Sequence, residues 1–298
     1  MENFLQLGAA GLALGSRYAL VALGFVVIYR ATGVINFAQG SFVALGAYLA
    51  YNFHQTWGLP FLAAVLLAIA VSGVIGAAVE RFVLRRVVGQ PVFAVIMITV
   101  GLLFVLDQVV TTIWGHDTKS MGDPWGIDKV DLAGINIAVR DLWTLGIAGL
   151  MVAAFFALFR YSGLGLAMRA TAIDQEAAMA RGIDVRRVFA LSWAIAAMVA
   201  AVAGMTLAAG PAAVNPGIGY IALAAFPAMI LGGLDSPGGA VVGGLIIGIT
   251  QTLTAGYQPT YAEFLGDNFH AVMPYVVMIV ILMIRPFGLF GTREVERL

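Results

Sequence analysis

Residues 160–187, RYSGLGLAMRATAIDQEAAMARGIDVRR, are the longest polar passage in an otherwise apolar chain. It contains three acidic residues and five of the chain's sixteen basic ones: Arg160, Arg169, Arg181, Arg186 and Arg187. A basic loop between apolar segments marks the cytoplasmic side of a membrane. The stretch therefore predicts how the segments before and after it are oriented.

The composition excludes an ordinary soluble domain. Of the 298 residues, 61% are hydrophobic and only 11% are charged, whereas soluble domains carry about 25% charged residues. In a bilayer, backbone hydrogen bonds are satisfied only in helices of about 20 apolar residues or in closed barrels. The apolar runs here are continuous rather than alternating, which favours helices. We therefore predict an all-α, polytopic membrane protein with one transmembrane domain over residues 1–298.

Nine apolar segments follow one another along the chain, and they predict eight or nine transmembrane or re-entrant helices. The segments are 5–29, 34–50, 59–79, 91–113, 141–159, 189–209, 218–234, 238–255 and 271–286.

The loops between these segments differ in charge. The loop around 80–90 holds three arginines and the tail holds Arg293 and Arg297, whereas the loops around 114–141 and 256–270 are largely acidic. Because Lys and Arg accumulate on the cytoplasmic side, we expect 80–90, 160–187 and the C-terminus to lie in the cytoplasm. The N-terminus is then outside, and one topology satisfies every basic loop.

Two of the apolar segments are short and follow helix-breaking residues. Thr32–Asn36 precedes segment 34–50, and residues 210–217 precede segment 218–234. Interrupted helices at corresponding points of two halves point to a transport site, because freed backbone groups need a polar lining or water. Ordinary interfacial turns are the alternative, and whether 34–50 crosses or re-enters stays open. The candidate pathway residues here are Asn36, Gln39, Gly40, Ser41 and Asn215.

Two charged residues, Arg17 and Asp107, fall inside apolar segments. Ionisable residues within the membrane are functional candidates by default, so both join the candidate pathway. Arg17 could grip a substrate carboxylate, pair with Asp107 inside the bundle, or snorkel outward from a first helix that begins later than residue 5.

Small residues recur every four positions along segment 238–255. Gly239 and Gly243 form one series, and Ala240, Gly244 and Gly248 form a second. Small residues at this spacing let helices approach backbone to backbone. We interpret these glycines as helix-packing positions, within the chain or against a partner.

The sequence contains no recognisable catalytic, nucleotide-binding or metal-binding motif. Cysteine is absent, neither lysine follows a glycine as in a Walker A loop, and His54, His116 and His270 are isolated. No serine lies in a GxSxG setting, and a net charge of zero suggests no nucleic-acid partner. These features favour a conduit over an enzyme and predict no metal site.

Within the opening stretch, Glu176-Ala177-Ala178 is followed three residues later by Gly182. This pattern resembles the EAA-x3-G signature of bacterial ABC-importer permeases, although that family's later Ile and Leu-Pro are missing. Three other stretches resemble the LivH-type permeases of branched-chain amino acid importers over nearly the whole chain. They are residues 18–24 with 33–40 (GVINFAQG), the glycine-rich turn 232–244, and the ending 285–291 (RPFGLFG).

The resemblance implies a permease subunit of the bacterial inner membrane, lacking a cofactor of its own. Its implied partners are a second homologous permease, two cytoplasmic subunits that bind ATP and Mg²⁺, a periplasmic solute-binding protein and membrane lipid. A short helix within 171–183 would dock on an ATPase, and the solute-binding protein would dock on loops 51–58, 114–140 and 256–270. The implied docking residues are Asp174, Glu176, Ala177, Ala178 and Gly182.

The substrate is the least determined feature. Branched-chain amino acids are the first expectation, but relatives would carry histidine in place of Gln39 and neutral residues in place of Arg17 and Asp107. Urea, short amides and organic or aromatic acids are handled by similar permeases and stay open. So do an ATP-independent secondary transporter and a permease pair of either identical or homologous chains.

Overall fold

All nine expected apolar segments form helices in the computed structural model. The structure describes residues 2–87, 90–122, 126, 128–132, 135–209 and 213–292. In these ranges, six helices are long and apolar enough to cross a membrane. They are α1 (Glu2–Thr32), α3 (Phe61–Phe82), α4 (Val92–Trp114), α5 (Val139–Tyr161), α8 (Val185–Ala208) and α10 (Pro237–Tyr261). The predicted all-α polytopic fold is confirmed.

The remaining three apolar segments are shorter. They form α2 (Gln39–Tyr51), α11 (Phe269–Ile284), and the 3-10 turn η4 (Pro216–Tyr220) that runs into α9 (Ile221–Gly232). At 1.5 Å per residue, α2 is about 20 Å long, less than the roughly 30 Å of a hydrocarbon core. Every residue from Gln39 to Ala50 is buried. Segment 34–50 is therefore a half-helix that begins inside the bundle, and the π-helical turn η1 (Asn52–Thr56) extends it.

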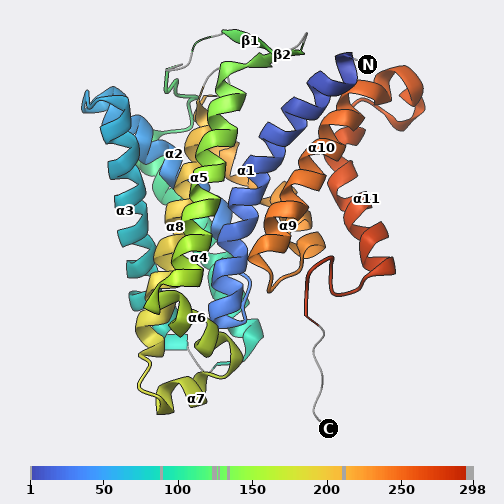
Figure 1. The fold of residues 1–298 in the computed structure, drawn as a ribbon. Helices are drawn as coiled ribbons and strands as arrows, with labels where there is room; N and C mark the ends of the chain where they lie inside the picture. The colour runs from blue at the N-terminus through green and yellow to red at the C-terminus, as the bar shows by residue number, and fades with distance from the viewer. Residues whose placement is uncertain are drawn as a thin grey trace.

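The bundle has two distinct ends (Figure 1). One carries the antiparallel strands β1 (Lys129–Leu132) and β2 (Ile135–Ala138) and is called here the hairpin end. The other carries α6 (Gly163–Ile173) and α7 (Gln175–Ala180) and is called the α7 end. Helix α1 starts at the hairpin end and finishes at the α7 end. Two further 3-10 turns, η2 (Leu84–Val87) and η5 (Glu263–Leu265), follow α3 and α10.

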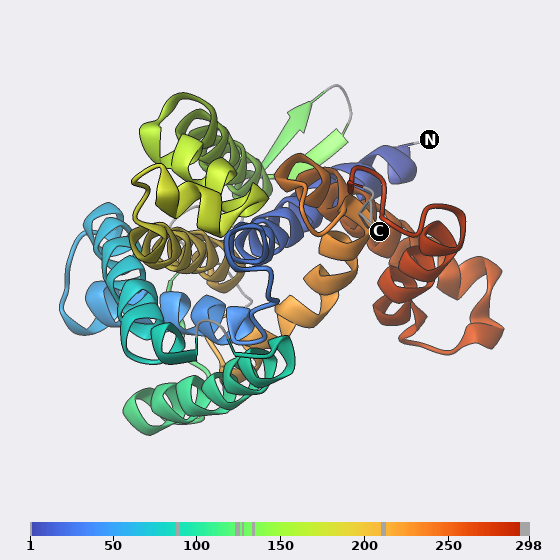
Figure 2. The ribbon, with the colours of Figure 1, turned by 90° about the horizontal axis from the view of Figure 1, so that it is seen from below.

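The core lies along α1, which runs between α8 and α10 (Figure 2). Glycines let α10 approach α1 closely: a Cβ added to Gly244 would lie 2.5 Å from the backbone nitrogen of Ala19, and one on Gly248 would overlap Gly15. On its other face, Gly239 and Gly243 lie against the α9 carbonyls of Gly232 and Ala228. Both glycine series thus lie where α10 meets another helix of the same chain.

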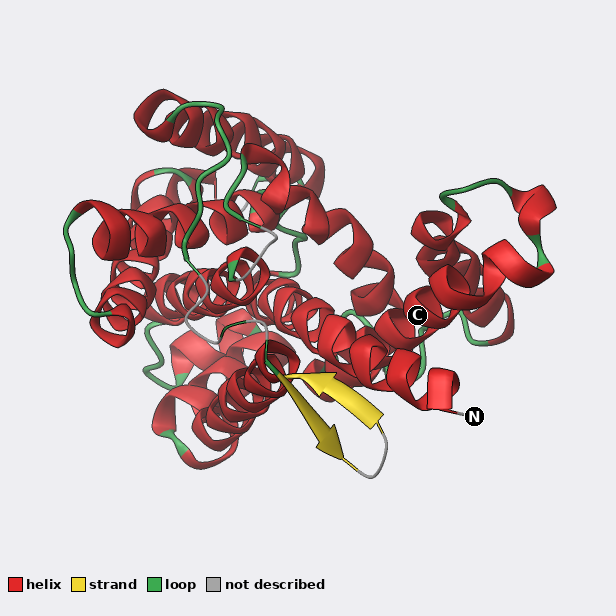
Figure 3. Ribbon diagram, turned by 90° about the horizontal axis from the view of Figure 1, so that it is seen from above, coloured by secondary structure: helices red, strands yellow, loops and turns green. Residues whose placement is uncertain are grey.

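Helix α2 is pressed against α8 in the same way. A Cβ on Gly46 would overlap Ala201, and one on Gly204 would overlap the carbonyl of Val43. Helix α11 packs against α9 and α10 and lies at one edge of the molecule, as the view from the hairpin end shows (Figure 3). Buried α2 is therefore enclosed by the main bundle, while α11 lies at its periphery.

Candidate functional site

The break between α1 and α2 is held by side chains rather than left open. Gly33 adopts a positive φ of 73° and turns the chain back into the bundle. The backbone N–H of Ala38 donates to Asn36 Oδ1 (3.0 Å), and the N–H of Phe37 donates to Thr99 Oγ1 on α4 (3.3 Å). Backbone groups freed by a break at membrane depth need such partners. Two backbone N–H groups of the first break are thus satisfied by side chains, one of them on α4.

Asn36 and Gln39 are both fully buried. The Asn36 amide donates to Gln39 Oε1 (3.4 Å), and the Gln39 amide donates to the carbonyl of Ala196 on α8 (3.3 Å). A methyl group on Gly24 of α1 would overlap the Gln39 amide nitrogen. Gln39 therefore occupies a slot between α1 and α8 that only glycine at position 24 leaves open.

The next two residues of α2 contact other elements. Gly40 lies against η4, where an added Cβ would overlap the carbonyl of Gly219. The Ser41 hydroxyl lies 2.7 Å from Asp107 Oδ1 and 3.2 Å from the carbonyl of Leu103, both on α4. The first turn of α2 thus joins α8, η4 and α4 through three consecutive residues. Four candidate pathway residues meet there in two hydrogen-bonded pairs, Asn36 with Gln39 and Ser41 with Asp107.

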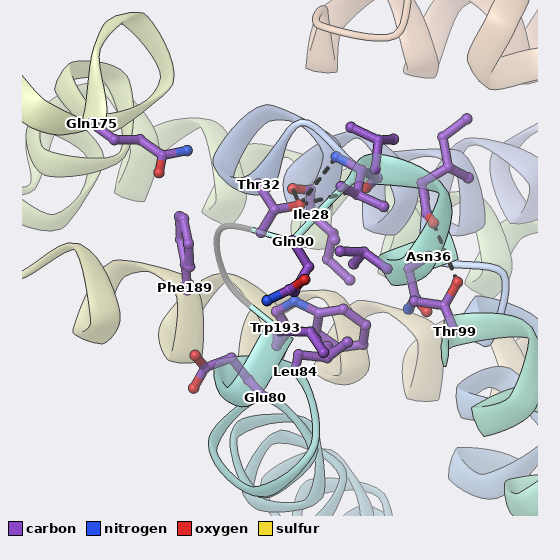
Figure 4. A pocket seen from close by; sticks show the side chains of 15 residues that line it. Ile28, Thr32, Asn36, Glu80, Leu84, Gln90, Thr99, Gln175, Phe189 and Trp193 are labelled. Atoms are coloured by element: carbon purple, nitrogen blue, oxygen red, sulfur yellow. Dashed lines mark hydrogen bonds between the residues drawn. The ribbon is translucent and has the colours of Figure 1, made fainter. Parts of the chain in front are cut away.

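A pocket of about 150 Å³ opens on the α7 side of this junction and is called the inner pocket. Figure 4 shows Asn36 and Thr99 on one wall and Gln175, Phe189 and Glu80 on the opposite wall. The lining comes from α1, the first break, α3, η2, α4, α7 and α8. A helix at the α7 end therefore contributes a wall to the same cavity as the first break.

A second pocket of about 250 Å³, the outer pocket, lies between α2, the outer half of α4 and η4. Its lining combines apolar walls with a carboxylate, a hydroxyl, an imidazole and a phenol: Ala44, Asp107, Val110, Thr111, His116, Pro216, Gly217 and Tyr220. Thr99 and Asn36 line the inner pocket, while Asp107 lines the outer one. The Ser41–Asp107 hydrogen bond therefore joins α2 to α4 beside the outer pocket, further along α4 than Thr99.

The second break is clasped by the loop that follows α4. Residues 210–212 lie outside the described part of the chain. Beyond them, Val214 and Lys119 exchange two backbone hydrogen bonds of 2.7 and 2.8 Å, and Ala213 adopts a positive φ of 51°. Asn215 precedes η4 and lines a third pocket with Ile218 and Ile221. Asn215 is thus near η4 but not part of the Asn36–Gln39 hydrogen-bonded pair.

Arg17 lies elsewhere. Its guanidinium reaches Asp141 Oδ1 (3.4 Å) and Thr144 Oγ1 (3.3 Å) on α5. The hypothesis of an Arg17–Asp107 pair is wrong, because α1 faces α5 at this level while Asp107 faces α2. The snorkelling interpretation is also wrong, because α1 already begins at Glu2 and only 17% of the Arg17 side chain is exposed. Arg17 lines neither the inner nor the outer pocket.

At the α7 end, the docking residues form a compact helix–turn unit. Asp174 ends α6 and caps α7 by accepting from the N–H of Ala177 (3.0 Å). Glu176 and Ala177 are exposed, whereas Ala178 is 4% exposed and packs with Ala31, Val185 and Phe189. Gly182 adopts a φ of +83° in open space, so its conformation, not crowding, requires glycine.

Several residues of this region carry no motif and were not singled out in the sequence. Glu80 is 1% exposed and receives a two-point ion pair from Arg85 (2.8 and 3.3 Å). Arg85 also donates to the carbonyl of Arg186 at the start of α8 (3.3 Å). The sequence signal available for this ion pair was an acidic residue at the end of an apolar helix, followed five residues later by an arginine. Thr99 had a signal too, since it lies two helical turns before Asp107 on one face of α4.

Known proteins resemble this chain over nearly its full length. The family described as "Branched-chain amino acid transport system / permease component" matches residues 8–282. The high-affinity branched-chain amino acid transport system permease protein LivH of Salmonella typhimurium is 31% identical, covering 99% of this chain and 97% of that protein. BraD of Pseudomonas aeruginosa, with the same description, is 30% identical, covering 99% and 98%. The galactofuranose transporter permease protein YtfT of Escherichia coli is 27% identical, covering 90% and 76%.

The match spans both broken helices, both pockets and the α7 unit. This chain belongs to the branched-chain amino acid transport system permease-component family.

Proposed function

We propose that this chain is the membrane-spanning permease subunit of an ABC importer for branched-chain, hydrophobic amino acids. Family membership supports the transport role, and the names of the LivH and BraD relatives support this substrate class. The chain would act without a nucleotide site of its own. Its partners would be a second homologous permease, two cytoplasmic subunits that bind ATP and Mg²⁺, and a periplasmic solute-binding protein.

The observation that carries the proposal is the position of α7. Its Ala178 packs against Ala31, two residues before the first break, and against Phe189 of α8. Phe189 and Gln175 also line the inner pocket together with Asn36. A partner that pulls on the exposed face of α7 would therefore displace the wall of that pocket. This is the shear of packed helices that opens a site to the opposite side.

In this proposal the α7 end faces the cytoplasm of a bacterial inner membrane and the hairpin end faces outward. The N-terminus is then outside and the C-terminus inside, as the distribution of Arg and Lys between the loops indicates. The solute-binding protein would deliver substrate near η1, the β1–β2 hairpin and the loop between α10 and α11. The substrate would pass the first turn of α2, where Asn36, Gln39, Gly40 and Ser41 separate the two pockets.

Reconstitution with the encoded partners tests the function. The chain is co-expressed with the companion permease, the two ATP-binding subunits and the solute-binding protein, and placed in proteoliposomes. We expect uptake of radiolabelled leucine that requires ATP inside and all five chains. Uptake driven by an ion gradient without the ATP-binding subunits would show a secondary transporter instead.

A second substrate class is favoured by one observation. The relative YtfT is named for a sugar, so the same architecture serves chemically different solutes. Urea, short amides and organic acids are further candidates of small polar size. Competition of each solute with leucine for binding to the solute-binding protein distinguishes these classes. A competitor that binds while leucine does not would replace the amino-acid assignment and leave the importer assignment in place.

A further inference from the structure

We propose that the outer pocket binds the ammonium group of the transported solute through Asp107. The proposal rests on the importer function above and adds the chemical group that the permease itself recognises. It starts from the position of Asp107, seven residues before the end of α4 at Trp114. At 1.5 Å per residue, that is about 10 Å inside the helix end.

In the described part of the chain, the charge of Asp107 has no counter-ion. The Ser41 hydroxyl donates a hydrogen bond to Asp107 Oδ1 (2.7 Å). Among the described residues, no Lys, Arg or His nitrogen lies within 4.0 Å of the carboxylate. Arg17, the other intramembrane charge, is held by Asp141. A carboxylate in a membrane-spanning helix is costly unless a cation or several hydrogen bonds compensate it. The counter-ion of Asp107 is therefore a cation that binds during transport and is then released.

The cavity beside the carboxylate suits a small organic cation rather than a metal ion. Ala44, Val110 and Pro216 give it apolar walls, and Asp107 is the one acidic residue among the described residues that line it. A divalent ion needs several oxygen ligands, which a single carboxylate does not supply. At about 250 Å³, the pocket falls below the roughly 300–1,000 Å³ of sites for drug-sized ligands. An amino acid fits this description: its ammonium pairs with Asp107, and its hydrocarbon side chain contacts the apolar walls.

The backbone hydrogen bonds at the rim of the outer pocket fit a site that opens and closes. His116, Pro216 and Gly217 line the outer rim. The backbone pair between Lys119 and Val214 joins the two segments that carry these residues. Breaking the two backbone hydrogen bonds between Lys119 and Val214 would separate these segments and open the pocket toward the hairpin end. The site therefore lies on the hairpin side of the bundle, where a binding protein at that end would release solute.

The test compares two charge-removing variants in the reconstituted full transporter. Asp107→Asn keeps the shape of the side chain and its ability to accept from Ser41, and removes only the charge. Asp184→Asn is the matched control, because Asp184 is exposed at the opposite, α7 end and does not line the pocket, and Asn can keep its cap on the N–H of Arg187. Hydrogen bonds to charged groups contribute enough for about a tenfold or larger loss of leucine uptake efficiency in Asp107→Asn. Asp184→Asn should stay within about twofold of the wild type.

A second measurement needs no variant. The purified assembly without its solute-binding protein is titrated with leucine and with 4-methylpentanoate, which is leucine without the ammonium group. We expect leucine to bind at least about tenfold more tightly. Equal binding of the two solutes, or wild-type uptake by Asp107→Asn, overturns the ammonium site. Failure of the proposed importer function is distinguishable from failure of the ammonium site, because wild-type assemblies would then show no ATP-dependent leucine uptake.

Discussion

The guanidinium of Arg17 lies 3.4 Å from Asp141 Oδ1, joining α1 to α5 across 124 residues of sequence. Both side chains are largely buried, at 17% and 16% exposed. Removing one member of a buried pair leaves an uncompensated charge, so each single change is costlier than the loss of the pair itself.

We expect Arg17→Gln and Asp141→Asn each to lower the free energy of unfolding by about 1–3 kcal/mol, with a coupling of about 1 kcal/mol in the double variant. Unfolding in mixed micelles measures the four free energies of this cycle. The control cycle combines Arg17→Gln with Asp107→Asn, which share no partner and should be additive within about 0.5 kcal/mol. Coupling in the control but not between Arg17 and Asp141 would contradict the observed pairing.

Gly244 is the position where a side chain would force α1 and α10 apart. A side chain there would lie 2.5 Å from the backbone of Ala19, so Gly244→Leu should lower stability by about 1–3 kcal/mol, as overpacked cores do. Thermal unfolding in detergent measures the loss. Gly101→Leu is the matched control, because Gly101 is also within a membrane-spanning helix but has nothing within 4 Å of an added Cβ. Equal losses in the two variants would show that helix contact is not the cause.

Gly24 and Gln39 form a second steric pair with a sharper test. Gly24→Ala should push the Gln39 amide away from the Ala196 carbonyl and cost about 1–3 kcal/mol for the unsatisfied buried groups. Leucine uptake should fall in the same variant, because Gln39 orders the first turn of α2. In a Gln39→Ala background the added methyl meets no amide, so Gly24→Ala should then cost less than about 0.5 kcal/mol. An undiminished cost in that background would place the strain elsewhere.

Gly182 separates backbone conformation from contact at the proposed ATPase interface. Its φ of +83° disfavours any side chain by about 1–2 kcal/mol, so Gly182→Val should distort the turn after α7. We expect ATP hydrolysis by the reconstituted importer to continue while leucine uptake per ATP falls several-fold. Gly163→Val is the control, since Gly163 lies at the same end in open space without a positive φ.

Glu176 tests the same interface through charge. It is exposed at the start of α7 and has no hydrogen-bonding partner among the described residues. Glu176→Lys should therefore leave thermal stability within about 0.5 kcal/mol and still uncouple hydrolysis from uptake. Exposed Asp184→Ala would instead weaken the cap of α8, where Asp184 accepts from the N–H of Arg187. Unchanged coupling in Glu176→Lys would remove α7 from the docking assignment.

The helices were predictable because hydrophobicity, helix breaks and caps are local properties of a chain. All nine apolar segments become helices, and Asp174 and Gly182 bound α7 as short polar and glycine residues do elsewhere. The β1–β2 hairpin was not predicted, because four-residue strands in a polar loop leave no hydrophobic period long enough to recognise.

The partners of the buried polar residues depended on packing, and sequence spacing could not assign them. Arg17 and Asp107 were the two evident intramembrane charges, yet they do not pair with each other: Arg17 binds Asp141 and Asp107 binds Ser41. Gln39 is held from α8, 157 residues away, and only because Gly24 leaves room for it.

Local sequence properties were enough to predict a bundle of apolar helices with two broken segments and one polar loop. Those features follow from transfer of side chains and backbone between water and lipid, which each segment undergoes on its own. Helix packing, in contrast, is what brings the first break against α8, η4 and α4, turns Asp107 toward a pocket, and makes α7 and Asn36 line the same cavity. These relationships depend on which helices approach closely, and that is set by the fit of many distant side chains at once.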